Sequence, residues 1–141
     1  MANEVTVTIA DVRPLQGAVI RRACAAEALA FGDVVYVSSA TGDIPLVSKC
    51  VPGTLATGHA YGIVVSGNLG GTSVASGEPC DVVVLGPVTG YLSMTPGATI
   101  WASSDSAGRL STVVGSKSTI VGLAESASIV LVRPAQVVRS P

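Results

Sequence analysis

The sequence predicts a small all-β protein, a barrel or sandwich of roughly eight to ten short strands with few or no helices. Apolar residues recur at every second position or in short solid blocks rich in valine and isoleucine, which is typical of strands. Sixteen glycines and eight prolines separate these blocks with turn-forming pairs. A chain of 141 residues has the size of one domain and can bury a core without disulfides or metal.

The first expected strand runs from Glu4 to Ile9 and alternates cleanly. Val5, Val7 and Ile9 face one way, and threonines face the other. Residues 1–14 are therefore interpreted as either an N-terminal arm or the first strand of the barrel. The sequence leaves both alternatives open.

The second element, residues 18–31, is the one segment with helix character. It contains several alanines, which favour helix. However, Val19 and Ile20 are β-branched, and Gly32-Asp33 leads directly into a further apolar block. We therefore expect a strand over residues 18–23, followed by a loop or one short turn.

The remaining strands follow from the apolar blocks of the body. They are expected at residues 34–37, 63–65, 82–85, 99–102, 119–121 and 129–132. Residues 15–133 are predicted to form one barrel-like domain, and residues 134–141 a C-terminal tail.

An internal echo links the two halves of this body. The stretch from Phe31 to Ser39 resembles the stretch from Pro96 to Ser104 in its glycine, its apolar block and its closing serines. Each copy is later followed by a glycine inside an apolar strand, Gly62 and Gly122. Two copies predict a pseudo-repeat within one domain. Tyr36 and Trp101 occupy matching places in the two copies, and we expect both to pack in the core.

No pattern of catalytic or metal-binding residues stands out, so we expect no enzyme, cofactor or metal site. The single histidine, His59, lies in a turn-like stretch, and the acidic residues are scattered singly. The sequence has neither a phosphate-binding loop nor a Gly-x-Ser-x-Gly motif. Cys24, Cys50 and Cys80 form no Cys-x-x-Cys pair and are interpreted as small apolar residues in a reducing compartment.

Charge is unusually sparse, with eight basic and nine acidic residues. We infer that much of the exterior faces other protein subunits, in a homo-oligomer, because a free monomer usually carries more surface charge. A formal net charge of −1 argues against a nucleic-acid partner. No apolar run is long enough for a membrane helix, and the first residues lack the features of a signal peptide.

Several short stretches resemble head decoration, or capsid cement, proteins of tailed bacteriophages. They are residues 17–22, 27–37, 75–84, 86–90, 95–103 and 121–127. The resemblance covers roughly residues 15–133, and related β-modules also occur in head fibres and tail proteins. It implies a barrel-like, usually trimeric protein on the outer capsid lattice, without enzymatic activity or cofactor.

On this basis we expect a structural virion protein, made in the cytoplasm of the bacterial host and located on the capsid exterior. It would bind the lattice of the major capsid protein and stabilise the shell by bridging coat subunits. The alternatives are a head-fibre or tail adhesin module, and a ligand-binding or hydrolytic β-barrel. The residues expected to dock on the capsid are Glu4, Val5, Val7, Ile9, Arg13, Arg21 and Arg22.

Overall fold

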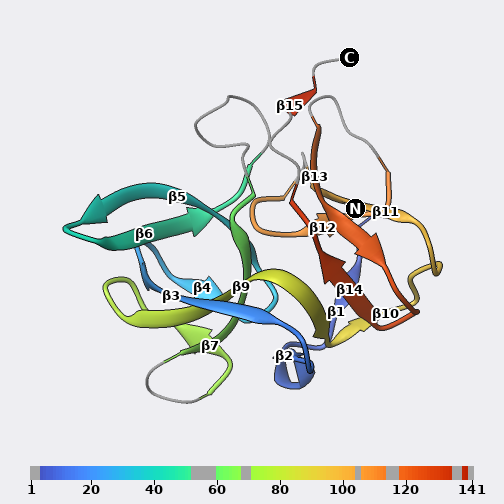
Figure 1. Cartoon of the computed structure of the whole chain (residues 1–141), viewed down its shortest axis with the longest axis horizontal. Coiled ribbons are helices and arrows are strands. Elements are labelled where there is room, and N and C mark those ends of the chain that lie inside the picture. The colour runs from blue at the N-terminus through green and yellow to red at the C-terminus, as the bar shows by residue number, and fades with distance from the viewer. Residues whose placement is uncertain are drawn as a thin grey trace.

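The computed structural model describes residues 4–51, 60–67, 71–103, 106–113, 118–134 and 138–139. Within these ranges the chain consists of strands, turns and a single 3-10 turn, η1 (Ile9–Asp11) (Figure 1). The prediction of an all-β fold with few or no helices is confirmed.

Strand lengths divide the described elements into two groups. Eight strands have four residues or more: β3 (Val19–Ala25), β5 (Val34–Thr41), β6 (Ile44–Lys49), β7 (Gly62–Gly67), β9 (Pro79–Thr89), β11 (Thr99–Ala102), β13 (Ser118–Ala124) and β14 (Ile129–Val132). Seven have two residues: β1 (Thr6–Val7), β2 (Arg13–Pro14), β4 (Leu29–Ala30), β8 (Ser73–Val74), β10 (Tyr91–Leu92), β12 (Leu110–Ser111) and β15 (Val138–Arg139).

Five of the long strands close into a barrel. Their order is β9-β3-β6-β5-β7, and β7 pairs with β9 to complete the ring. Only the β3–β6 contact in this ring is parallel; it joins Cys24 to Leu46 and Ala25 to Val47. Each strand buries small or β-branched side chains, and those with the least exposure include Ala23, Val35, Val47, Ile63 and Val83.

Strand β9 belongs to both halves of the molecule. Its first part pairs with β3 and β7, whereas residues 86–89 pair with β14. Gly86 stands at the changeover with a φ of 114°, and a Cβ there would lie 2.7 Å from the Cα of Ala18. The passage from one half to the other therefore requires glycine at this position.

The echoed stretches occupy equivalent places in the two halves. Val35 on β5 is the register partner of Gly62 on β7, and Ile100 on β11 is the register partner of Gly122 on β13. A Cβ on Gly62 would collide with the carbonyl oxygen of Val83, and one on Gly122 with that of Leu131. The pseudo-repeat in sequence is thus a repeat of strand pairing and of close backbone contact.

The aromatic pair of the echo is placed only partly as we expected. Tyr36 pairs with Ser48, and Trp101 pairs with Ser111, so the two positions are equivalent. Both aromatic side chains are only partly buried. The expectation that they pack in the core is therefore met only in part: the residues before them, Val35 and Ile100, are fully buried, whereas Tyr36 and Trp101 lie at the margin of the core.

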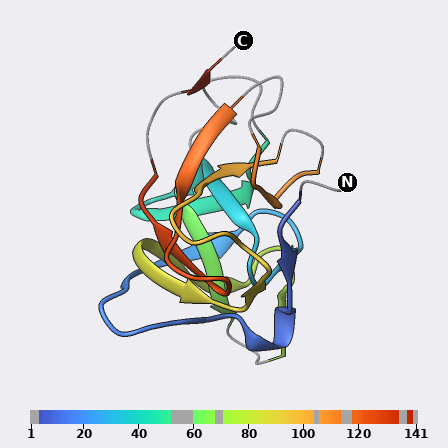
Figure 2. The same cartoon turned by 90° about the vertical axis from the view of Figure 1, so that its right-hand side faces the viewer.

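The N-terminal segment enters the second half as a strand. β1 pairs antiparallel with β10, and on its other side Glu4 forms a bridge with Ser111 of β12. The amide of Val5 donates a 2.9 Å hydrogen bond to the carbonyl of Leu110. Figure 2 shows this segment along one edge of the molecule, with η1 at its lower end. The segment therefore connects β10 to β12.

Of two strands expected near the N-terminus, the first is shorter than expected and the second is confirmed. The continuous strand expected over residues 4–9 is shorter, because β10 offers only two partner residues and the chain then turns into η1. The strand expected over residues 18–23 is confirmed and extends to Ala25 as β3. In the tail, β15 pairs with Ser118 and Thr119 of β13, a contact that the sequence did not indicate.

Candidate functional site

The expected N-terminal docking residues are part of the folded body. The Val5 side chain is 4% exposed and belongs to the core, while Val7 and Ile9 pack against that core. These three side chains therefore contact the core of their own chain. A role for them in docking stays a prediction, tested by the truncation described below.

Glu4 is held by serine hydroxyls. Ser103 Oγ donates a 2.9 Å hydrogen bond to its carboxylate. Burial acts to raise the pKa of Glu4, but the hydrogen bonds from Ser106 and Ser103 oppose this effect, and the pKa is lowered. The ionised carboxylate therefore helps to hold the segment against the turn that joins β11 to β12.

The two adjacent arginines of β3 have different surroundings. Arg22 lies opposite Asp81 on β9 and forms an ion pair with it at 3.0 Å. The other oxygen of Asp81 accepts a 2.8 Å hydrogen bond from Ser66 Oγ. Both arginines are exposed, but Arg22 is engaged by Asp81, so Arg21 is the more available to a partner.

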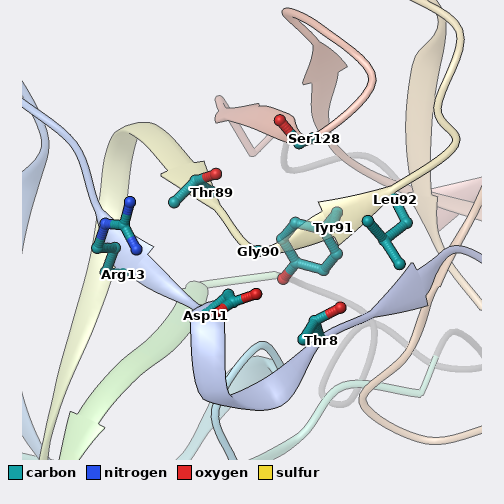
Figure 3. A pocket seen from close by; sticks show the side chains of 8 residues that line it. All are labelled: Thr8, Asp11, Arg13, Thr89, Gly90, Tyr91, Leu92 and Ser128. Carbon is teal, nitrogen blue, oxygen red and sulfur yellow. The ribbon is translucent and has the colours of Figure 1, made fainter.

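Arg13 lies beside a cavity of about 310 Å³ (Figure 3). The cavity is bounded by the N-terminal segment on one side, by the end of β9 and β10 on another, and by the β13–β14 turn. Its lining residues are Thr8, Asp11, Arg13, Thr89, Gly90, Tyr91, Leu92 and Ser128. The expected docking residues Glu4 and Arg13 therefore lie along the same edge as this cavity, whereas Arg21 and Arg22 lie on β3.

The buried ionisable groups include Asp33, Cys50 and Cys80. Asp33 accepts a 2.9 Å hydrogen bond from the amide of Ala30, and burial raises its pKa. Burial also raises the pKa of Cys50 to about 12 and that of Cys80 to about 11, so both remain thiols at neutral pH. No group of three metal-ligating side chains occurs among the described residues. His59 lies outside them.

Two parts of the described surface each expose more than one large apolar side chain. One is the hairpin end, residues 37–44, where all eight residues are exposed and Asp43 is the only charge; Ile44 is 54% exposed there. The other is the β3–β9 patch, formed by Val19, Ile20 and Leu85, of which Leu85 is 50% exposed. The hairpin tip and the start of β3 lie far apart in Figure 1.

Comparison with protein-family models, with curated proteins and with solved structures finds no match to this chain. The resemblance to capsid decoration proteins therefore stays a prediction. In the described part of the chain, no helix has the length and apolar character needed to cross a membrane.

Proposed function

We propose that this protein binds the outer surface of a bacteriophage capsid as an oligomer, a trimer by the resemblance, and stabilises the shell by bridging coat subunits. The observation that carries the proposal is the pair of separate surfaces that expose large apolar side chains, the hairpin end with Val37 and Ile44 and the β3–β9 patch. A protein that bridges neighbours needs at least two contact surfaces, and isolated exposed apolar residues are less informative than clusters.

The two surfaces suit different partners. The β3–β9 patch adjoins Arg21, whose guanidinium suits carboxylates on a coat subunit, so we assign this patch to the capsid. The hairpin end carries almost no charge and projects beyond the barrel, so we assign it to a neighbouring copy of the same chain. Oligomerisation multiplies each weak capsid contact through avidity.

The second candidate function is a head-fibre or tail adhesin module. The polar cavity beside β1 and β10 favours it, because an adhesin needs a ligand site. A hydrolytic barrel has less support. Among the described residues, the cavity beside β1 and β10 is lined by one carboxylate, Asp11, and a second cavity of about 210 Å³, on the Glu4 side of β1, is lined by one other, Glu4.

The deciding experiment is co-sedimentation of the purified protein with empty phage heads, followed by heating of the heads. We expect the protein to pellet with the heads and to raise the temperature at which they break. Leu85→Lys should weaken pelleting, and Ile44→Lys should lower the oligomeric state measured by light scattering. Val113→Lys is the matched control, because Val113 is similarly exposed and lies outside both surfaces.

Two results would overturn the proposal. One is a wild-type protein that neither pellets with the heads nor protects them from heat. The other is normal pelleting and normal oligomerisation by both lysine variants.

A further inference from the structure

The cavity beside β1 and β10 brings together polar side chains from distant parts of the chain. Thr8 and Asp11 come from the N-terminal segment, Thr89 from the end of β9, and Ser128 from the turn before β14. Figure 3 shows them around the backbone of Gly90, with Arg13 at one end and Leu92 at the other. These side chains are neighbours only in the folded chain, because they come from segments that are distant in the sequence.

These polar groups are not used by the fold itself. Within the described part of the chain, the structure records no side-chain hydrogen bond or ion pair for Thr8, Asp11, Arg13, Thr89 or Ser128. The cluster of Arg22, Asp81 and Ser66 on the barrel wall is different, since its members bond to one another. Asp11 and Arg13 are two residues apart and still do not pair, so both are available to a ligand.

The backbone that forms the cavity floor is held rigidly. The amide of Thr8 donates a 2.8 Å hydrogen bond to the carbonyl of Gly90, and the amide of Tyr91 donates one of 3.3 Å to the carbonyl of Ser128. Beneath them, the Tyr91 side chain is 1% exposed. These hydrogen bonds fix the backbone to which the rim side chains are attached, so binding does not have to order that backbone as well.

The chemistry of the rim selects the class of ligand. Asp11 repels an anion such as phosphate, and Arg13 repels a metal cation, so neither ion fits alone. Three hydroxyls both donate and accept, the carboxylate accepts, and the guanidinium donates. Leu92, 47% exposed, adds an apolar contact. A ring that carries several neighbouring hydroxyls on an apolar carbon face matches this set of groups.

We propose that this cavity binds one uncharged sugar ring of a saccharide. Its volume, about 310 Å³, lies at the small end of the usual range for ligand sites, roughly 300–1,000 Å³, which suits a single ring. The acid and the guanidinium hold hydroxyls through charge-assisted hydrogen bonds, and Leu92 packs against the ring. This inference does not rest on capsid binding.

The test is a titration of the isotope-labelled protein, followed by NMR, with methyl glycosides of glucose, galactose and mannose and with N-acetylglucosamine. At least one of them should give saturable shifts confined to residues 8–13, 89–92 and 128, with a dissociation constant in the millimolar range. Asp11→Asn and Thr89→Ala should each weaken binding by about tenfold, from the loss of one hydrogen bond to a charged or polar group. Glu78→Gln and Thr72→Ala lie outside the cavity and outside both proposed contact surfaces; they are the matched controls and should leave the affinity unchanged.

Sodium phosphate and glycine serve as comparison probes for an anion and a zwitterion. Tighter binding of either one than of every glycoside would overturn the proposal. So would the absence of glycoside shifts at the cavity, or an affinity unaffected by Asp11→Asn and Thr89→Ala. Because the titration uses the isolated protein, its failure leaves the capsid proposal untouched, and failure of head binding leaves the sugar site untouched.

Discussion

The hydroxyl of Tyr91 donates a buried 2.8 Å hydrogen bond to the carbonyl of Gly32. Tyr91 lies on β10 in the second half, and Gly32 immediately precedes β5 of the barrel. Burial raises the pKa of the phenol, so it stays protonated and remains a donor. This contact is a buried side-chain link between the two pseudo-equivalent halves of the chain, in addition to the shared strand β9.

Tyr91→Phe removes this donor and leaves the Gly32 carbonyl without it. We expect a loss of about 1–3 kcal/mol in the free energy of unfolding, measured by urea denaturation. Tyr36→Phe is the control, since Tyr36 is only partly buried, and it should change stability by no more than about 0.5 kcal/mol. Equal stabilities of the two variants would show that the bond contributes nothing to the joining of the halves.

The two echoed strand glycines should be equally intolerant of a side chain. Gly62→Ala and Gly122→Ala each drive a Cβ into a carbonyl oxygen of the neighbouring strand, so both should lower the melting temperature by several degrees or prevent folding. Gly42→Asn is the control, because Gly42 has a φ of 60° that asparagine tolerates and open space around it. A normal melting temperature in either alanine variant would contradict the equivalence of the two positions.

Acid should weaken the attachment of the N-terminal segment. The pKa of Glu4 is lower in the folded state, so the folded state binds fewer protons, and the stability from Glu4 is lost as the pH falls from about 4.5 through the folded pKa. Asp33 has the opposite sign: its pKa is raised, so its contribution favours the fold at low pH and is lost as the pH rises above 3.8 through the folded value.

Thermal melts of wild type, Glu4→Gln and Asp33→Asn across pH 3–6 separate these two effects. Glu4→Gln should flatten the decline on the acid side, and Asp33→Asn should make that decline steeper, since it removes the opposing contribution. Superimposable pH profiles for all three proteins would refute both assignments.

Deletion of residues 2–10 distinguishes a docking arm from a structural strand. Because Val5 is buried and its amide bonds to Leu110, we expect the truncated protein to lose its cooperative thermal transition. A milder variant, Val5→Ala, should cost about 1–3 kcal/mol, whereas Thr6→Ala at an exposed position should be nearly neutral. A truncated protein that still folds and oligomerises, but no longer binds phage heads, would instead identify the segment as the docking arm.

Local sequence patterns were sufficient to predict seven of the eight long strands, but not β6 (Ile44–Lys49), whose apolar residues are interrupted by Pro45 and Ser48. The block from Val34 to Val37 is β-branched and bounded by turn residues, and the structure forms β5 there. The strand at residues 18–23 was also predictable against the helix preference of its alanines, because a β-branched pair precedes them. The echo around Gly62 and Gly122 likewise indicated two equivalent strands before their pairing was known.

Pairing between distant segments was not predictable in the same way. The pairing of β1 with β10, the bridge from Glu4 to Ser111 and the contact of β15 with β13 depend on which edges remain open after the rest of the chain has folded. The polar cavity also depends on the pairing of the N-terminal segment, since Asp11 and Ser128 line the same cavity only when that segment lies beside β10. No spacing in the sequence brings them together.

The sequence by itself determined that the protein is all-β, where its long strands other than β6 lie and that its two halves echo each other, because strand formation follows local residue type and alternation. Only the tertiary structure decided that Val5 is a core residue, that Tyr36 and Trp101 lie partly outside the core, and which apolar side chains stay exposed. The physical reason is that burial depends on which strands become neighbours, and strand partners many residues apart are chosen by the packing of the whole chain.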